Sequence, residues 1–415
     1  MQDLQEIGRL SKESSQELIK MNTKEKNIIL KGIAEAIIEN KDNILQANAL
    51  DVKEAEIRHI KISLIDRLKL NEERLLDMVQ GIKNIALLDD PIGEIIEGKK
   101  LENGLEIIKK RVPLGVIAII YEARPNVTTD AFALCFKTGN SVILKGGSDA
   151  INTNIEIVKV IKKTIKKFNV NSNCITLIED TSKETTMQLM KLNKYIDVLI
   201  PRGGKKLIKT VVENSTIPVI ETGSGNCHIY VDEFANIQKA LNIIENAKTQ
   251  RVGVCNSCES LVIHKNIEKE ILPKLVNVLK KHNVEIRGDE YAKKLVPGIE
   301  RASEEDFITE YLDYIISIKS VDSIQDAIKH INLCSTKHSE CIITENYENA
   351  QKFLNEIDSS CVYVNASTRF TDGGQFGFGA EIGISTQKLH ARGPMGLKEL
   401  TTMKYAIYGS GQIRI

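Results

Sequence analysis

Residues 116–148 read VIAIIYEARPNVTTDAFALCFKTGNSVILKGGS, and this stretch decides the fold class. The apolar runs 116–120 and 141–144 have the length and the β-branched content of buried strands. The segment between them is expected to form a helix that begins at Asn126. A strand, a helix and a second strand in this order predict a parallel sheet with helices packed on it.

The alternation of strand and helix continues along the chain. Further strands are expected at 174–177, 198–200 and 218–220, with helix-like stretches such as 151–167 and 205–214 between them. A second series of strands is expected near 227–231, 261–264, 314–319, 341–344 and 361–364. Two such series predict an α/β protein with two doubly wound domains.

The flanking segments have other patterns. Residues 1–90 carry apolar side chains at helical spacing. Residues 92–112 hold two β-rich runs around Asn103-Gly104, which predicts a hairpin, and the strand-like tail 401–415 could pair with it. We therefore expect one domain at 1–91 and 113–226, a second at 227–397, and a small β arm at 92–112 and 398–415.

Bulk composition limits the classes of partner. The chain has 415 residues, with 56 basic and 56 acidic side chains and no Trp, which argues against a surface for nucleic acid or membrane. The polar N-terminus does not resemble a signal peptide, and the eight scattered cysteines form no paired framework. We therefore expect a cytoplasmic enzyme-sized protein with reduced thiols.

Cys255 is the candidate nucleophile. It lies in the stretch RVGVCNSCES at 251–260, where small and polar neighbours would leave its sulfur accessible. The alternative is a buried cysteine that packs as a small apolar group. Cys258 completes a C-x-x-C motif, but no second such motif or paired His accompanies it, so no metal site is expected.

Polar residues follow several expected strands, where a doubly wound domain binds its ligands. Asn126 could donate to an oxyanion or cap its helix. Lys145 before Gly146-Gly147, and Arg202 before Gly203-Gly204, suit a ribose or a pyrophosphate, although no G-x-G-x-x-G is present. The glycine-rich segment after residue 364 contributes Ser367, Thr368 and Arg369, which could hold a small anionic substrate.

These windows together resemble the aldehyde dehydrogenase superfamily, most closely the branch that reduces γ-glutamyl phosphate in proline biosynthesis. The resemblance covers nearly the full length. Its most specific stretches are 121–127, 221–230, 254–264 and 376–397. It implies an aldehyde-dehydrogenase-like fold with an oligomerisation arm, and hence a homo-oligomer.

The resemblance also implies roles for single residues. Cys255 matches the nucleophile and Asn126 the oxyanion-hole amide. The cofactor side is matched by Lys145, Ser148, Arg202, Gly203, Gly204, Glu221 and Glu310. The uncharged Ser148 leaves room for a 2′-phosphate, which favours NADPH. Glu221 matches the general base of hydrolytic relatives, but a phosphorylating enzyme needs no activated water.

The implied reaction is the NADPH-dependent reduction of L-glutamyl 5-phosphate to L-glutamate 5-semialdehyde, with release of phosphate, through a thioacyl group on Cys255. Arg124 is a candidate for the leaving phosphate, and Ser367, Thr368 and Arg369 are candidates for the amino-acid end of the substrate. Association with glutamate 5-kinase, which makes the labile acyl phosphate, is chemically reasonable, although no motif marks it.

Three alternatives stay open at this point. The first is an ordinary NAD-dependent aldehyde dehydrogenase that hydrolyses its thioester with Glu221 as base. The second is a non-redox acyltransferase or hydrolase that pairs Cys255 with His228 or His264. The third is a binding scaffold in which Cys255 belongs to the core.

Overall fold

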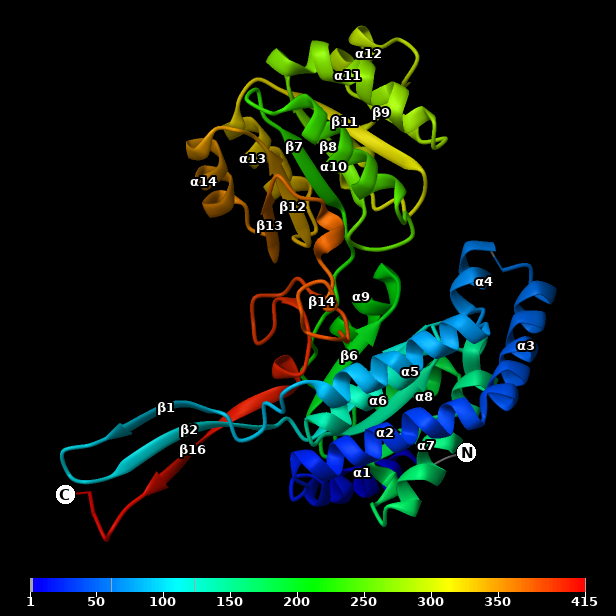
Figure 1. The fold of residues 1–415 in the computed structure, drawn as a ribbon, viewed down its shortest axis with the longest axis vertical. Coiled ribbons are helices and arrows are strands. Elements are labelled where there is room, and N and C mark those ends of the chain that lie inside the picture. Colours follow the sequence, from blue (N-terminus) through cyan, green and yellow to red (C-terminus); the bar gives the residue numbers. More distant parts are fainter. Residues whose placement is uncertain (1–2, 61, 123, 415) are drawn as a thin grey trace. The chain divides into compact units, whose positions relative to one another are not determined.

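The computed structural model describes residues 3–60, 62–122 and 124–414. The chain divides into two compact units (Figure 1). Unit 1 comprises residues 1–221, 377–383 and 395–415, and unit 2 comprises residues 222–376 and 384–394. The boundary was expected at 226/227, whereas the first segment of unit 1 ends at Glu221. Unit 1 also contains residues 377–383 and 395–397, which were expected in the second domain, and the β arm.

Unit 1 begins with helices, as expected for residues 1–90. They are α1 (Leu4–Leu18), α2 (Thr23–Glu39), α3 (Lys41–Ile57), α4 (Ile62–Leu68) and α5 (Glu72–Leu87). Side-chain caps define several of the starts, because Asp3 accepts N–H groups of α1 and Asn22 forms a capping box with Glu25 at α2. Asn71 caps α5 in the same way.

The central sheet of unit 1 is parallel and has the strand order β5-β4-β3-β6. Its strands are β3 (Val116–Tyr121), β4 (Ser141–Gly146), β5 (Ile175–Leu177) and β6 (Val198–Arg202). The helices that follow them are α6 (Asn126–Lys137), α7 (Ile151–Lys167), α8 (Lys183–Leu189) and α9 (Lys205–Asn214). The strand–helix alternation read from the sequence is therefore confirmed.

The pleat of β3 explains how both faces of this sheet are covered. Val116, Ala118 and Ile120 point to one face, where they share an apolar cluster with Leu4 of α1 and Val211 of α9. The intervening side chains of β3 are also buried, so the strand is apolar along its whole length. This burial on both sides is why the sequence shows a continuous apolar run there.

One expected strand of unit 1 does not form. Residues 218–220 make only an isolated bridge between Val219 and Leu199. Pro218 has no N–H to give to a ladder, which limits pairing at this edge of the sheet.

The β arm is a three-stranded antiparallel sheet with the order β1-β2-β16. Its strands are β1 (Ile95–Lys100), β2 (Glu106–Pro113) and β16 (Thr401–Tyr408). The hairpin predicted around Asn103-Gly104 forms, and the C-terminal tail pairs with β2 from Thr401 opposite Pro113 to Tyr408 opposite Glu106. Figure 1 shows the three strands running together away from the rest of unit 1.

Unit 2 contains a seven-stranded sheet with the order β10-β9-β11-β8-β7-β12-β13, parallel at each pairing. The strands are β7 (Cys227–Val231), β8 (Cys258–His264), β9 (Glu285–Gly288), β10 (Glu300–Arg301), β11 (Ile315–Val321), β12 (Ser339–Ile343) and β13 (Cys361–Val364). The helices are α10 (Ile237–Thr249), α11 (Lys265–Lys280), α12 (Glu290–Leu295), α13 (Ile324–Cys334) and α14 (Tyr347–Glu356).

Two apolar clusters sandwich this sheet. On β8, Leu261 and Ile263 pack into the cluster beneath α10 and α11, whereas Val262 packs into the cluster beneath α13 and α14. The second doubly wound domain is therefore confirmed. The edge strand β10 and its neighbour β9 were not expected, because they are short and carry charged residues such as Glu285 and Arg301.

Candidate active site

The loop that carries Cys255 connects α10 to β8 in unit 2. Cys255 lies in a turn three residues before the strand begins, and its thiol-bearing side chain is partly exposed. Cys258, by contrast, is the first residue of β8, is fully buried and directs its thiol to the Ser260 carbonyl. Burial raises the pKa of the Cys258 thiol, so of the two cysteines Cys255 is the one placed for chemistry.

The backbone of the loop is held closely on one side by β7 and the residues before it. The Cys227 thiol donates to the Cys255 carbonyl at 3.1 Å. Gly225 lies so near that a Cβ there would fall 1.5 Å from the same carbonyl oxygen. Only glycine at 225 permits this approach, which fixes the main chain at Cys255, the candidate nucleophile.

Residues 367–371 hold the other side of the loop. The buried Thr368 hydroxyl donates to the Asn256 carbonyl at 2.8 Å, and the Asn256 amide donates to the Thr371 carbonyl at 2.9 Å. The Ser367 hydroxyl accepts the Arg369 N–H at the start of a short 3-10 turn. The structure thus brings Ser367, Thr368 and Arg369 to the nucleophile loop, and it uses Thr368 to position that loop.

Two arginines bring positive charge to the Cys255 loop. Burial lowers the pKa of Arg369 first, and the neighbouring Arg251 lowers it further, while the interaction with the Cys255 thiol raises it. The Arg369 guanidinium is also anchored, because its Nε donates to Gln250 at 2.8 Å. A positive charge that interacts with a thiol favours its thiolate form.

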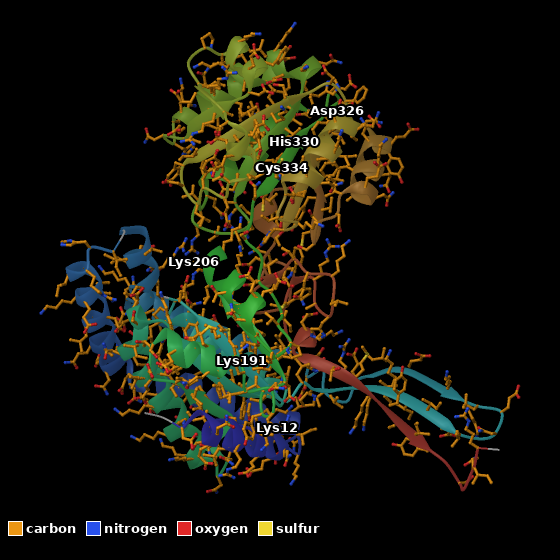
Figure 2. All side chains as sticks on the ribbon, turned by 180° about the vertical axis from the view of Figure 1, so that it is seen from behind. Lys12, Lys191, Lys206, Asp326, His330 and Cys334 are labelled. Atoms are coloured by element: carbon orange, nitrogen blue, oxygen red, sulfur yellow. The ribbon has the colours of Figure 1, made fainter. Side chains whose placement is uncertain are left out.

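Neither histidine of the Cys–His alternative is suitably placed. His264 ends the strand that Cys258 begins, so about 20 Å of extended chain separates the two residues. His228 is fully buried, and among the described residues its side chain bonds to Glu340 and not to a cysteine. It also stacks edge-on against His330, which precedes Cys334 by one turn on α13 (Figure 2).

Glu310 is held within unit 2 by the same backbone segment that contacts Cys255. Its carboxylate accepts the Gly225 N–H at 2.7 Å. Two residues later, the Leu312 N–H donates to Glu259, which forms a fully buried ion pair with Lys248 at 2.6 Å. Leu312 has a left-handed backbone with φ of 53°, so this turn is tightly specified.

In unit 1, the predicted residues gather at the carboxyl ends of β3, β4 and β6. Tyr121 lies opposite Gly146 on one side and Arg202 on the other. The chain order β5-β4-β3-β6 reverses direction between β3 and β6, which makes that point the ligand crevice of a doubly wound sheet. Lys145 and Arg202 lie in the last two residues of their strands, and Asn126, Ser148, Gly203 and Gly204 follow the strand ends.

Asn126 does not cap its helix, although that role was an alternative from the sequence. Pro125 occupies the N-cap position, and no side chain closes the cap. The exposed Asn126 side chain instead donates to Asp130 at 3.0 Å, one turn further along α6. Tyr121 bonds to Thr128 at 2.7 Å and so ties the end of β3 to the same helix.

Lys145 and Ser148 differ in exposure. Lys145 is almost fully buried at the end of β4, where its ammonium donates to the Gly146 carbonyl at 3.3 Å. Burial lowers its pKa, and the nearby Asp180 acts in the opposite direction. Ser148 is exposed at the start of a 3-10 turn, next to Asp149, which pairs with Arg58 at 3.1 Å.

The start of α9 shows how an anion can be held there. Gly204 is the N-cap, and its N–H donates to a Glu122 carboxylate oxygen at 3.0 Å. A Cβ on Gly203 would fall 2.7 Å from the Glu122 carboxyl carbon. Lys206 stands exposed in the first turn (Figure 2). The helix start therefore holds an anionic oxygen through the Gly204 N–H, and its use by a pyrophosphate stays a prediction.

Two carboxylates that bond to candidate site residues, Glu122 and Asp130, were not singled out from the sequence. Glu122 directly follows the β3 strand, so its position at a strand end was the available signal. Asp130 follows Asn126 by four residues, a spacing at which helix side chains meet. Arg124 lies between them in sequence and is half-buried, and Glu221 is the last residue of unit 1 before the boundary.

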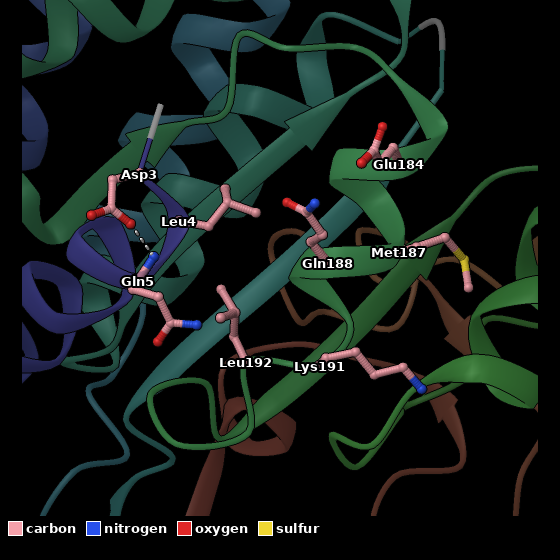
Figure 3. Close-up of a pocket in the computed structure, with 8 residues that line it drawn as sticks. All are labelled: Asp3, Leu4, Gln5, Glu184, Met187, Gln188, Lys191 and Leu192. Atoms are coloured by element: carbon pink, nitrogen blue, oxygen red, sulfur yellow. Dashed lines mark hydrogen bonds between the residues drawn. The ribbon is translucent and has the colours of Figure 1, made fainter. Parts of the chain in front are cut away.

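A pocket of about 700 Å³ lies elsewhere in unit 1 (Figure 3). Its lining includes Asp3 and Gln5 at the start of α1, and Gln188 and Lys191 at and just after α8. None of the predicted site residues lines it, so it is separate from the strand ends described above. No helix in the described residues is long and apolar enough to cross a bilayer.

Comparison with known proteins agrees with this geometry. A family model described as the aldehyde dehydrogenase family matches residues 2–314 and 307–405. A Lachnospira eligens protein named gamma-glutamyl phosphate reductase is 58% identical over 414 residues and covers all of both chains.

Solved structures extend the likeness to the fold. The crystal structure of gamma-glutamyl phosphate reductase from Thermotoga maritima superimposes with a TM-score of 0.97 at 50% identity and covers all of both chains. An acetylating aldehyde dehydrogenase from Geobacillus thermoglucosidasius, at 19% identity and a TM-score of 0.72, shares the fold over 99% of this chain and 97% of its own. The chain belongs to the aldehyde dehydrogenase family, in the branch of the gamma-glutamyl phosphate reductases.

Proposed function

We propose that this protein reduces L-glutamyl 5-phosphate to L-glutamate 5-semialdehyde with NADPH and releases phosphate, as a step of proline biosynthesis. The observation that carries the proposal is the Cys255 loop. A partly exposed thiol stands on a main chain fixed by Gly225 and Thr368, with Arg369 beside it.

The chemistry begins with attack of the Cys255 thiolate on the acyl carbon. Asn126 and the Cys255 N–H stabilise the oxyanion, the carbon–oxygen bond to phosphate breaks, and a thioester remains on the sulfur. Reduction of the thioester gives a thiohemiacetal, which collapses to the aldehyde and regenerates the thiol. Two such steps replace one difficult displacement.

The residues of unit 1 suit a nicotinamide dinucleotide phosphate. Lys145 and Ser148 would hold the adenosine ribose and its 2′-phosphate, and Arg202, Gly203 and Gly204 would hold the pyrophosphate at α9. The fit rests on the Gly204 N–H, which already donates a hydrogen bond to a carboxylate oxygen. Glu310 would contact the nicotinamide ribose and Glu221 would lie nearby. The bound cofactor supplies the hydride for the reduction.

The substrate contacts follow from charge. Arg124 would receive the leaving phosphate, and Arg369, with Ser367 and Thr368, would face the amino-acid end. An Arg369→Ala variant should raise KM for glutamyl phosphate; an unchanged KM would remove Arg369 from the substrate site.

A homo-oligomer assembled through the β arm is part of the proposal, and association with glutamate 5-kinase stays a prediction.

The test of the nucleophile uses the two cysteines of the loop. Cys255→Ser should abolish NADP⁺ reduction by glutamate semialdehyde and phosphate, while Cys258→Ala should retain it because Cys258 is buried. Equal activity of Cys255→Ser and the wild type would overturn the covalent scheme. Activity without added phosphate would identify a hydrolytic aldehyde dehydrogenase instead.

The oxyanion role has its own test. Asn126→Ala should lower kcat by about 100-fold. Because Asn126 does not cap its helix, the variant should fold as the wild type does, and its thermal midpoint should change only by what the lost bond to Asp130 contributes. A change of stability without a change of kcat would contradict the role.

A further inference from the structure

The side-chain amide of Asn126 has a hydrogen-bond partner, Asp130, that has no role in the reaction proposed so far. Its Nδ2 donates to Oδ2 of Asp130 at 3.0 Å, across one turn of α6. An amide nitrogen has two N–H groups, so this bond leaves one of them available. A carboxylate only accepts, so an Asn126 amide turned the other way would set its oxygen against Asp130.

Asp130 is not placed as an ordinary helix-surface acid. It is only partly exposed, and among the described residues no Lys or Arg lies within ion-pair distance of it. Burial raises the pKa of Asp130 to about 6, against the weaker effects of Asn126 and of Arg202 at the end of β6. A carboxylate kept in a costly position with one amide partner is typical of a functional site.

The neighbouring helix α5 lies close to this carboxylate. A Cβ on Gly81 of α5 would be in ordinary van der Waals contact with Asp130 Oδ1, at 3.6 Å. The main chain of Asn126 has a partner of its own, because the Thr129 hydroxyl donates to the Asn126 carbonyl at 2.9 Å. The main chain and the side chain of Asn126 are therefore held separately.

We propose that Asp130 is a positioning residue: it orients the Asn126 amide so that one N–H binds the carboxylate and the other points to the substrate's carbonyl oxygen. This inference rests on the proposed function, in which Asn126 stabilises the oxyanion. The negative charge of Asp130 also polarises the amide, which strengthens the remaining N–H as a donor.

A double-mutant cycle tests the inference. Asp130→Ala should lower kcat by roughly tenfold and change KM little, because the oxyanion forms only after binding. Asp130→Asn keeps an acceptor oxygen and should lose less. In an Asn126→Ala background, Asp130→Ala should cause no further loss, because the amide that it orients is gone.

The control is Asp77→Asn, an exposed acid on α5, which should leave kcat unchanged. Losses that multiply in the double variant would show that Asp130 acts independently of Asn126 and would overturn the inference. Wild-type kcat in Asp130→Ala, beside a large loss in Asn126→Ala, would overturn this inference alone. Wild-type kcat in Asn126→Ala would overturn the oxyanion role itself.

Discussion

At the scale of single residues, Glu122 decides what occupies the start of α9. Its carboxylate accepts the Gly204 N–H and lies against Gly203, where the pyrophosphate of the cofactor is proposed to bind. Two anionic groups at one helix start compete for the same N–H groups and repel each other. Glu122 therefore sets a cost that the incoming pyrophosphate must overcome.

We expect Glu122→Gln to bind NADPH more tightly, with Kd lower by roughly two- to tenfold, because the charge is lost while an acceptor oxygen remains. Fluorescence titration of NADPH measures this directly. Glu35→Gln, an exposed acid on α2, is the matched control. Weaker binding by Glu122→Gln would mean that the carboxylate contacts the cofactor favourably, for example by accepting a hydrogen bond from a hydroxyl group of the cofactor.

At the scale of elements, the sequence predicted where the strands end, but it did not predict which side chains from distant segments meet. The apolar runs predicted β3, β4, β7 and β8, and with them the positions of Asn126 and Cys255 near strand termini. The meeting of Arg369 with Cys255 depends on chain closure over more than a hundred residues, which no local pattern encodes. The buried Lys248–Glu259 pair was hidden similarly, because charged residues usually indicate an exposed face.

A carboxylate in α11 makes the stability of unit 2 depend on pH. Glu268 is fully buried, and its Oε2 has no hydrogen-bond partner among the described residues. Ser320 contacts both Glu268 and Asp289 at 2.9 Å, but a hydroxyl can donate to only one of them. Burial, with a smaller effect of Asp289, raises the pKa of Glu268 from 4.5 to about 7.

The sign follows from the raised pKa. The folded unit binds the Glu268 proton more tightly than the unfolded chain, so this stabilisation is complete below pH 4.5 and is lost as pH rises to about 7. The whole change is on the order of 3 kcal/mol. Glu268→Gln should therefore gain stability relative to the wild type as pH increases from 5 to 8.

Thermal midpoints of the two proteins across this pH range provide the measurement. The exposed Glu270→Gln on the same helix is the control, and its difference from the wild type should not vary with pH. A constant difference between Glu268→Gln and the wild type would mean that Glu268 does not titrate in this range.

At the scale of the whole molecule, the β arm requires another surface. All six residues of β1 are exposed, and so are Met403, Tyr405, Ile407 and Tyr408 on β16. A three-stranded sheet that exposes this many apolar side chains to water has no core of its own. The proposed homo-oligomer supplies a second copy of the arm or of unit 1 to cover it.

Ile407→Glu should therefore break the oligomer, because it places a charge where an exposed apolar side chain is proposed to become buried between copies. Native mass or light scattering should show a smaller species than the wild type at micromolar concentration. Lys404→Gln, an exposed position on the same strand, should leave the mass unchanged. Since Ile407 lies in the arm and Cys255 in unit 2, single-turnover thiol chemistry should survive dissociation. An oligomer that stays intact in Ile407→Glu would show that the interface does not include this face of β16.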